Sequence, residues 1–318
     1  MISASGTHLA AVSRRGIAAT SGANEHGQCK LPIGCARSAR AVACGRFHTV
    51  WLCNDGDVEA CGMNHYGQCN IPMWPPADYT QVSAAAYHTG LLHSDGIRET
   101  DNTTAAERCI SPVVCLSVPY TPMGGCPIAL RLCCLPPPAG SVVLVGSNRY
   151  GQCDLPYGCI SQRFQQVSCG WYHTVVLSSD GRAYACGGNE HGQCEIPIGK
   201  PYKQVSAGGR HTVLLHHPNG AVSACGDNSH GQCDIPELER GIWYTQVSAG
   251  LRHTVLLRSD GMAVAFGHLR GMTIPVLPEG MTYTQVCASS TGAGVTALLR
   301  SDGTAMTLAG ANVGERAL

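Results

Sequence analysis

The sequence predicts an all-β fold in which small sheets repeat around one axis, and three observations lead to this prediction. A unit of about forty residues recurs eight times along the chain. Each unit alternates short β-prone runs with turn residues. The 39 glycines and the other turn residues interrupt every run long enough to form a helix. Short antiparallel strands repeated at this period are typical of a β-propeller, so we expect a single propeller domain over residues 1–318 with seven or eight blades.

The repeat units keep a regular spacing even where their consensus residues are lost. In the third and fourth units the consensus is degenerate, but Cys109 still falls at the position that Cys194 holds in a well-preserved unit. We therefore expect each of them to form a blade. The eighth unit has no closing Ile-Pro segment, so the ring is expected to close with one shortened blade or with help from the other terminus. The units are expected to begin near Met1, Ala43, Ser83, Cys126, Ser168, Ser206, Ser248 and Cys287.

Within one unit each segment has its own predicted place. The first run, residues 204–207, contains small residues and suits a strand close to the central axis, where backbones approach one another. The second run, residues 212–215, is largely apolar and suits a strand covered on both faces. An Asp-Gly hairpin precedes the third strand in five of the eight units, because Asp and Gly tolerate a positive φ. The closing segment, Ile235-Pro236 in this unit, suits an outer edge strand, where proline is tolerated.

Composition narrows the classes of partner and location. Basic and acidic residues balance at 21 each and make up 13% of the chain, which argues against nucleic acid and anionic membranes as partners. The N-terminal residues lack the apolar core of a signal peptide, and the most apolar stretch, residues 127–146, is broken by Arg131 and three prolines. We therefore expect an intracellular, cytoplasmic protein. Its 19 cysteines are expected to be mainly reduced and buried.

Two cysteine and histidine patterns could indicate chemistry. Cys44 with His48, and Cys169 with His173, have the spacing of a thiol beside a base. Alanine replaces the cysteine in sister units, for example at Ala207, which favours a packing role. We therefore expect no catalytic residue and no enzyme activity.

Two loops could instead bind zinc. Each offers three possible ligands, whereas structural zinc takes four, so we expect no metal and no cofactor. The two triplets are Cys186, His191 and Cys194, and Cys225, His230 and Cys233.

A histidine before threonine recurs once per unit. A pH sensor is one interpretation. The regular recurrence favours a structural role, in which each histidine braces its blade through hydrogen bonds to neighbouring backbone. The histidines assigned to this role are His48, His88, His173, His211 and His253.

The positions just before those histidines vary from unit to unit. Up-and-down strands place these turns on one face, together with the G-x-N-x-x-G-Q loops. Aromatic and arginine side chains concentrate binding energy at interfaces, so we expect this face to bind a protein or peptide, with packing between the loops as the alternative. The expected partner-binding residues are Phe47, Tyr87, Trp171, Tyr172, Arg210 and Arg252. The same face is expected to carry His26, Tyr66, Tyr150, His191 and His230.

Residues 170–197, GWYHTVVLSSDGRAYACGGNEHGQCEIP, resemble the regulator of chromosome condensation (RCC1-like) repeat family in three features. These features are the Gly-x-x-His-Thr turn, the Asp-Gly hairpin and the Gly-x-Asn-x-x-Gly-Gln loop. The resemblance implies a propeller, usually of seven blades, and the compact repeats look most like those of the propeller-type β-lactamase inhibitor. Other relatives include a guanine-nucleotide exchange factor, recognition parts of HECT ubiquitin ligases and a plant ultraviolet-B photoreceptor. These relatives share a scaffold and differ in the surface loops that act.

The sequence therefore favours a non-enzymatic protein–protein interaction scaffold. It would act alone or as the recognition part of a larger regulatory or ubiquitin-ligase-type protein. The alternative is a guanine-nucleotide exchange regulator of a small GTPase. That alternative requires a loop that inserts into the partner, and the unit boundaries above leave no insertion longer than a few residues. The oligomeric state stays open.

Overall fold

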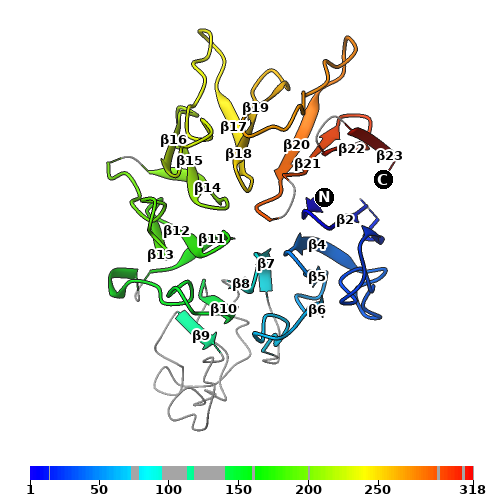
Figure 1. Ribbon diagram of the computed structural model, residues 1–318, viewed down its shortest axis with the longest axis vertical. Coiled ribbons are helices and arrows are strands. Elements are labelled where there is room, and N and C mark those ends of the chain that lie inside the picture. The colour runs from blue at the N-terminus through cyan, green and yellow to red at the C-terminus, as the bar shows by residue number, and fades with distance from the viewer. Residues whose placement is uncertain are drawn as a thin grey trace.

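Seven sheets stand around a common axis in the computed structural model (Figure 1). The structure describes residues 1–13, 15–72, 79–94, 113–117, 140–159, 162–199, 201–291, 294–309 and 312–317. Within these residues the only helical element is one 3-10 turn, Tyr157–Cys159. The predicted all-β propeller is confirmed, and the number of blades is seven.

Most blades consist of three antiparallel strands, and the third and seventh have four. In chain order the strands are β1 (Ile2–Ala4), β2 (His8–Val12) and β3 (Ala18–Gly22) in blade 1; β4 (Ala39–Cys44), β5 (His48–Cys53) and β6 (Val58–Gly62) in blade 2; β7 (Tyr79–Ala84), β8 (His88–His93), β9 (Val113–Ser117) and β10 (Val142–Gly146) in blade 3; β11 (Phe164–Cys169), β12 (His173–Ser178) and β13 (Ala183–Gly187) in blade 4; β14 (Tyr202–Ala207), β15 (His211–His216) and β16 (Val222–Gly226) in blade 5; β17 (Tyr244–Ala249), β18 (His253–Arg258) and β19 (Ala263–Gly267) in blade 6; and β20 (Tyr283–Ala288), β21 (Thr296–Arg300), β22 (Thr304–Ala309) and β23 (Asn312–Ala317) in blade 7.

The first strand of each blade lines the central axis, where the structure leaves a channel of about 220 Å³. Neighbouring first strands are joined through Gln and Ser side chains. Gln166 Oε1 accepts a hydrogen bond from Val205 N at 2.9 Å, and Ser168 Oγ accepts one from Ala207 N at 2.9 Å. Small residues at this position let the strands approach closely enough for these bonds.

The second strand of each blade supplies most of the hydrophobic core, and the core is shared between blades. Val175 and Leu177 of blade 4 pack against Tyr202, Val205 and Leu214 of blade 5, and all five are buried. Burial of one such side chain stabilises the fold by about 1.5–3 kcal/mol. Because each blade covers its neighbour, the ring folds as one body.

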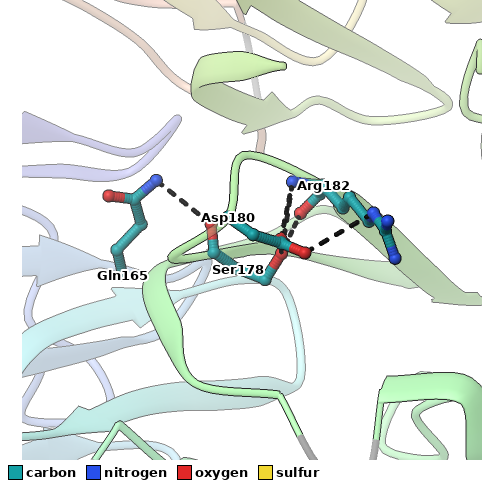
Figure 2. Close-up of polar contacts among 4 residues, drawn as sticks. All are labelled: Gln165, Ser178, Asp180 and Arg182. Carbon is teal, nitrogen blue, oxygen red and sulfur yellow. Dashed lines mark hydrogen bonds and ion pairs between the residues drawn. The ribbon is translucent and has the colours of Figure 1, made fainter. Parts of the chain in front are cut away.

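The hairpins between the second and third strands form the face that we call the hairpin face. Figure 2 shows the hairpin of blade 4, in which Gln165 Nε2 donates to Ser178 O at 3.2 Å. Arg182 N donates to Asp180 Oδ1 at 3.2 Å, and Arg182 Nε lies 3.5 Å from Oδ2 of the same carboxylate. The hydrogen bond from the Ser178 hydroxyl lowers the pKa of Asp180. Gly181 follows with a φ of +85°, which explains the glycine at this turn.

The third and fourth predicted units form a single blade, so the count of eight separate units was wrong. β10 pairs antiparallel with β8, in the place that third strands hold elsewhere, and β9 pairs parallel with β10 at the outer edge. Gly140 occupies the position of the hairpin glycine: it donates to Ser94 O at 3.3 Å, and its carbonyl accepts from Phe164 N at 2.9 Å. The open edge of β8 needs an antiparallel partner, and β10 supplies it.

Residues 95–139 therefore stand between Ser94 and Gly140, at the hairpin of blade 3. The expectation that no unit carries a long insertion was wrong. The predicted unit start at Cys126 and the aligned Cys109 lie outside the described residues.

Removal of this insertion should leave the ring intact. Deleting residues 96–139 would join Asp95 to Gly140 and restore a Ser-Asp-Gly hairpin like that of blade 4. The deletion also removes the edge strand β9, which pairs with β10 alone, so blade 3 would keep three strands, as most blades have. Because Ser94 and Gly140 are already hydrogen-bonded, we expect a folded protein whose thermal midpoint changes by only a few degrees, about 1 kcal/mol or less. Thermal unfolding followed by circular dichroism checks this, and an unfolded deletion variant would contradict the assignment of the hairpin.

The Ile-Pro segments are not outer strands, contrary to the prediction. They run as irregular chain, in which Ile196 and Ile235 pack partly buried against the core. The proline carbonyls accept hydrogen bonds from tyrosines that begin the next blade: Tyr244 Oη donates to Pro236 O at 2.9 Å, and Tyr283 Oη to Pro275 O at 2.8 Å. Proline has no N–H and cannot extend a β-ladder, but its carbonyl accepts the hydrogen bond that fixes the connection between blades.

The ring closes by side-chain packing between blades 7 and 1. β23 pairs with β22, so blade 7 is extended to four strands where a shortened blade was one expectation. Ile2, Ala4 and Ala11 of blade 1 form one buried cluster with Ala297 and Ala305 of blade 7. No helix among the described residues is long and apolar enough to cross a lipid bilayer.

Candidate functional site: the loop face

The turns before the histidines and the G-x-N-x-x-G-Q loops lie on one face, which we call the loop face. In blade 2, Cys44 pairs with Thr49 across the turn, and His48 pairs with Gly62, where the loop begins. The turn and the loop therefore leave the sheet at the same end, opposite the hairpin face. The loop face comprises residues 45–47, 85–87, 170–172, 208–210 and 250–252, and the loops 23–29, 63–69, 147–153, 188–194, 227–233 and 268–272.

Each loop is held by its own asparagine and glutamine. Asn189 Oδ1 accepts from Cys194 N at 2.8 Å, and Gln193 Oε1 accepts from His191 N at 3.0 Å. The same two bonds recur in loops 63–69, 147–153 and 227–233. These bonds leave the side chain at the position of His191 exposed on the surface, while Gln193 is buried.

The exposed loop residue of one blade contacts the residue before the histidine in the next blade. Most of these contacts are between aromatic rings or with an arginine, so the loop face carries a row of ring pairs along the blade junctions. The contacts are His26 with Phe47 at 5.1 Å between ring centroids, Tyr66 with Tyr87 at 5.3 Å, Tyr150 with Tyr172 at 4.7 Å, and Arg210 Nη1 with His191 Nε2 at 3.2 Å.

Arg46 joins the predicted residues of blades 2 to 4 into one cluster. Its guanidinium lies 4.9 Å from the centroid of Phe47 and 5.8 Å from that of Trp171, distances at which cation–π attraction acts. Arg46 Nη1 also donates to Tyr87 Oη at 3.3 Å. Trp171 stacks on Tyr172 with 5.3 Å between centroids. We call Arg46, Phe47, Tyr87, Trp171 and Tyr172 the aromatic cluster.

The aromatic cluster is partly packed and partly open. All five side chains are half-buried, so packing between loops accounts for some of their burial. Burial also raises the pKa of Tyr172. Arg46 was not among the partner-binding residues expected from the sequence, although it directly precedes Phe47. The residue two positions before the histidine is Arg46 in blade 2 but Ala86 in blade 3, so the sequence pattern does not indicate that Arg46 and Trp171 meet.

The other two predicted residues, Arg210 and Arg252, are exposed on blades 5 and 6. They lie in a basic arc, which we define as His191, Arg210, His230, Arg252, His268 and Arg270. Within it His230 and His268 lie 4.8 Å apart, and Arg270 Nε donates to His268 Nε2 at 3.2 Å. Desolvation and the nearby His230, Arg270 and Arg252 lower the pKa of His268.

The loop-face arginines have no carboxylate partners in the described part of the chain. The two ion pairs recorded there, Arg182 with Asp180 and Arg258 with Asp260, lie at hairpins on the opposite face. Arg46, Arg210, Arg252 and Arg270 are therefore free to meet acidic groups of a partner.

The repeated histidines lie beneath the loop face and join one blade to the next. Each Nε2 lies within hydrogen-bond distance of a threonine hydroxyl of the next blade, whereas backbone was the expected partner. In five of the six bridges that hydroxyl in turn donates to the carbonyl of a loop glutamine, for example Thr212 Oγ1 to Gln193 O at 2.7 Å. The six bridges are His8 to Thr49 at 2.7 Å, His48 to Thr89, His88 to Thr174 and His253 to Thr296 at 2.9 Å, and His173 to Thr212 and His211 to Thr254 at 3.0 Å.

The bridge fixes the protonation state of the histidines. Because the threonine proton is donated to the glutamine carbonyl, Nε2 carries the imidazole proton. Nδ1 of His48, His88, His173, His211 and His253 is buried without a partner. Desolvation lowers the pKa of His48, His88, His173 and His211 to about 3, and of His8 and His253 to about 4. His8 was missed in the sequence because Leu9 replaces the threonine.

The two thiol and histidine pairs lie in the core. Cys44 and Cys169 are buried, and burial raises the pKa of Cys169 to about 12, so this thiol is protonated at neutral pH. The paired His173 uses its Nε2 for the bridge to Thr212. The geometry gives these thiols no accessible surface.

Neither of the two triplets that were considered as zinc ligands brings its ligand atoms together. Among the described residues, the group of three that lies within 4.8 Å is Cys35, Cys53 and Glu59. Cys35 and Cys53 form a disulfide, with Cα atoms 5.3 Å apart. The other cysteines whose side chains are described are free. The thiols of the triplets donate instead to backbone, as Cys186 Sγ does to Gln152 O at 3.3 Å.

The fold and the loop face define a seven-bladed propeller built from repeats. Three segments, residues 39–68, 164–193 and 202–232, match the regulator of chromosome condensation (RCC1) repeat. The chain thus contains RCC1-like repeats at these three positions, and the resemblance seen in its sequence is confirmed. No curated protein matches the chain significantly.

Solved structures similar to this chain are also propellers of low sequence identity. The CRINKLY WD40 ectodomain of the receptor kinase ACR4 from Arabidopsis thaliana is 17% identical over 98% of this chain and 96% of its own, with a TM-score of 0.65. The ectodomain of the receptor kinase CR4 from Physcomitrella patens is 14% identical over 94% of this chain and 69% of its own, with a TM-score of 0.64. Prp20p from Saccharomyces cerevisiae, described with its binding to Gsp1p and histones, is 16% identical over 87% and 73%, with a TM-score of 0.60. At these identities the similarity concerns the fold.

Proposed function

We propose that the protein is a non-enzymatic interaction scaffold that captures a protein or peptide on its loop face. The observation that carries this proposal is the aromatic cluster around Arg46, continued by the unpaired arginines of the basic arc. Half-buried aromatic side chains are held in fixed positions, so they lose little entropy on binding. Prp20p, a propeller of similar fold, binds the proteins Gsp1p and histones, which agrees with this use of the fold.

Loss of the aromatic and arginine side chains should abolish capture. In the double variant Trp171→Ala and Arg210→Ala, each truncation removes about 2 kcal/mol or more if the residue is a hot spot, so affinity should fall at least about a hundredfold. Capture from the native lysate, followed by mass spectrometry and titration of the captured partner, measures the effect.

A matched control exists on the opposite face. Trp243 is 51% exposed beside the hairpins, and Arg182 is exposed within one of them. The double variant Trp243→Ala and Arg182→Ala removes the same residue types there and should keep full capture. Equal capture by both double variants would show that the loop face does not bind, and equal thermal midpoints would show that folding is not the cause.

One observation bears on the alternative, nucleotide exchange on a small GTPase. The insertion at residues 95–139 removes the objection that the chain has no long inserted loop. A nucleotide-release assay that compares the full chain with the 96–139 deletion decides between the two functions, because exchange through the insertion would be lost in the deletion variant. Use within a larger protein and an intracellular location stay predictions.

A further inference from the structure

One blade junction differs from the others, and it contains a cleft. Between blades 7 and 1, Val295 stands where other blades have the histidine, and Leu9 stands where they have the threonine. No bridge can form between these two apolar side chains. At this junction the structure has a cleft of about 510 Å³, lined by Leu9, Ala19, Ser21, Gly22, Val295 and Ala305 among others.

The other junctions show what occupies the corresponding place. In blades 1 to 5 the loop after the third strand lies against the next blade and presents its glutamine there. The contact is close at the glycine that ends the next third strand: a Cβ added to Gly187 would lie 3.0 Å from Gln152 Cα, and one added to Gly62 would lie 3.2 Å from Gln28 Cα. Gly22, the equivalent glycine of blade 1, lines the cleft instead.

Blade 7 does not supply such a loop from its described residues. After β22 the chain turns into β23, which pairs back along β22 over residues 304–309. The cleft beside Gly22 therefore lies where a glutamine loop lies at the junctions that follow blades 1 to 5.

One polar side chain in the cleft, that of Ser21, holds the position from which third strands of other blades donate to the incoming loop. In three blades a cysteine thiol on the third strand donates to the carbonyl of the incoming glutamine: Cys61 at 3.5 Å, Cys186 at 3.3 Å and Cys225 at 3.7 Å. Ser21 pairs with Leu9 as Cys61 pairs with Thr49, so it holds the same register position. In the described part of the chain the Ser21 hydroxyl has no hydrogen-bond partner, and a hydroxyl is a stronger donor than a thiol.

We propose that this cleft binds a Gly-Gln loop of another polypeptide, which docks between blades 7 and 1 as the chain's own loops do at the other junctions. The Ser21 hydroxyl donates to the backbone carbonyl of the incoming glutamine. Leu9 and Val295 contact the apolar atoms of the loop. Among the residues whose side chains the structure describes, those lining the cleft carry no Asp, Glu, Lys or Arg.

A peptide with the sequence of residues 189–197, Asn-Glu-His-Gly-Gln-Cys-Glu-Ile-Pro, tests the proposal on the full chain. Fluorescein-labelled peptide titrated under reducing conditions should bind with a dissociation constant below about 1 mM, followed by fluorescence anisotropy. A peptide with Gly192→Val should bind at least about tenfold more weakly, because Gly192 adopts a φ of +79° in the loop and valine disfavours it.

Two substitutions in the protein locate the binding. Ala19 is exposed and lines the cleft, so Ala19→Phe should fill it and reduce affinity at least about tenfold. Glu59 holds the same register position in blade 2, so Glu59→Phe is the matched control and should keep full affinity. Ser21→Ala, which changes only the hydroxyl, should weaken binding about threefold to tenfold.

The proposal fails if the peptide does not bind at about 1 mM, if the Gly192→Val peptide binds equally well, or if neither Ala19→Phe nor Ser21→Ala weakens binding. The Trp171→Ala and Arg210→Ala variant should bind the peptide normally. The cleft and the loop face are thus tested separately.

Discussion

Acidification from about pH 7 to about pH 5 should unfold the protein, because six buried histidines cannot take up protons in the folded state. Their folded-state pKa lies at about 3 to about 4, against 6.5 for an unperturbed histidine. Below about pH 6.5 the unfolded chain therefore binds more protons than the folded chain, and the free energy of unfolding falls as the pH falls. Each histidine contributes about 2 kcal/mol to this loss at pH 5, so together they match the whole stability of a typical domain, about 5–15 kcal/mol.

The geometry explains why the folded histidines resist protonation. The second proton would lie on Nδ1, which is buried without an acceptor in five of the six. In blade 5 this nitrogen lies close to Gly208, where an added Cβ would be 2.8 Å from His211 Nδ1. Urea unfolding at a series of pH values measures the effect, and the slope of the unfolding free energy against pH counts the protons. A free energy of unfolding that is equal at pH 7 and pH 5 would contradict the buried neutral histidines.

Thr212→Val should lower the free energy of unfolding by about 2–4 kcal/mol, although valine has nearly the same shape as threonine. The hydroxyl of Thr212 bridges His173 Nε2 and Gln193 O. Its loss leaves the buried His173 donor unpaired and leaves Gln193 O with the weak Cys225 thiol donor at 3.7 Å. Each unpaired group costs about 1–3 kcal/mol. Urea unfolding at neutral pH measures the change.

Two further variants separate the bridge from general effects of the substitution. Thr212→Ser keeps the hydroxyl and should retain most of the stability. Thr245→Val removes a single half-buried bond, from Thr245 Oγ1 to Leu257 O at 3.2 Å, and should cost about 1 kcal/mol or less. If the Val and Ser variants at position 212 were equally stable, the bridge would not hold the blades together.

Much of the fold could be predicted from local residue patterns, because each blade is specified by its own turns and apolar runs. The Asp180-Gly181 hairpin and the apolar second strand at 173–178 follow directly from the sequence. The pairing of β10 with β8 could not be predicted, because the sequence between Ser94 and Gly140 keeps a spacing that resembles a further unit. Which strand fills an open edge is decided by non-local hydrogen bonds.

The sequence predicted on which face the candidate site lies, but not which of its side chains contact one another. Alternation of the strands correctly places Trp171 and Tyr87 on the same face as Tyr150. Arg46 contacts Trp171, which lies two blades further along the ring. This contact depends on the diameter of the ring and on the small side chain of Ala86. The hydrogen-bond partner of each histidine could not be predicted either, because the threonine that it meets belongs to the next blade.

Hydrogen–deuterium exchange of the protein with and without its captured partner tests the central claim most directly. If the loop face binds, exchange should slow in the turns at residues 45–47, 85–87 and 170–172, and should not change in the hairpins at residues 54–57, 179–182 and 259–262. Protection of the hairpins, with the three turns unaffected, would contradict the account.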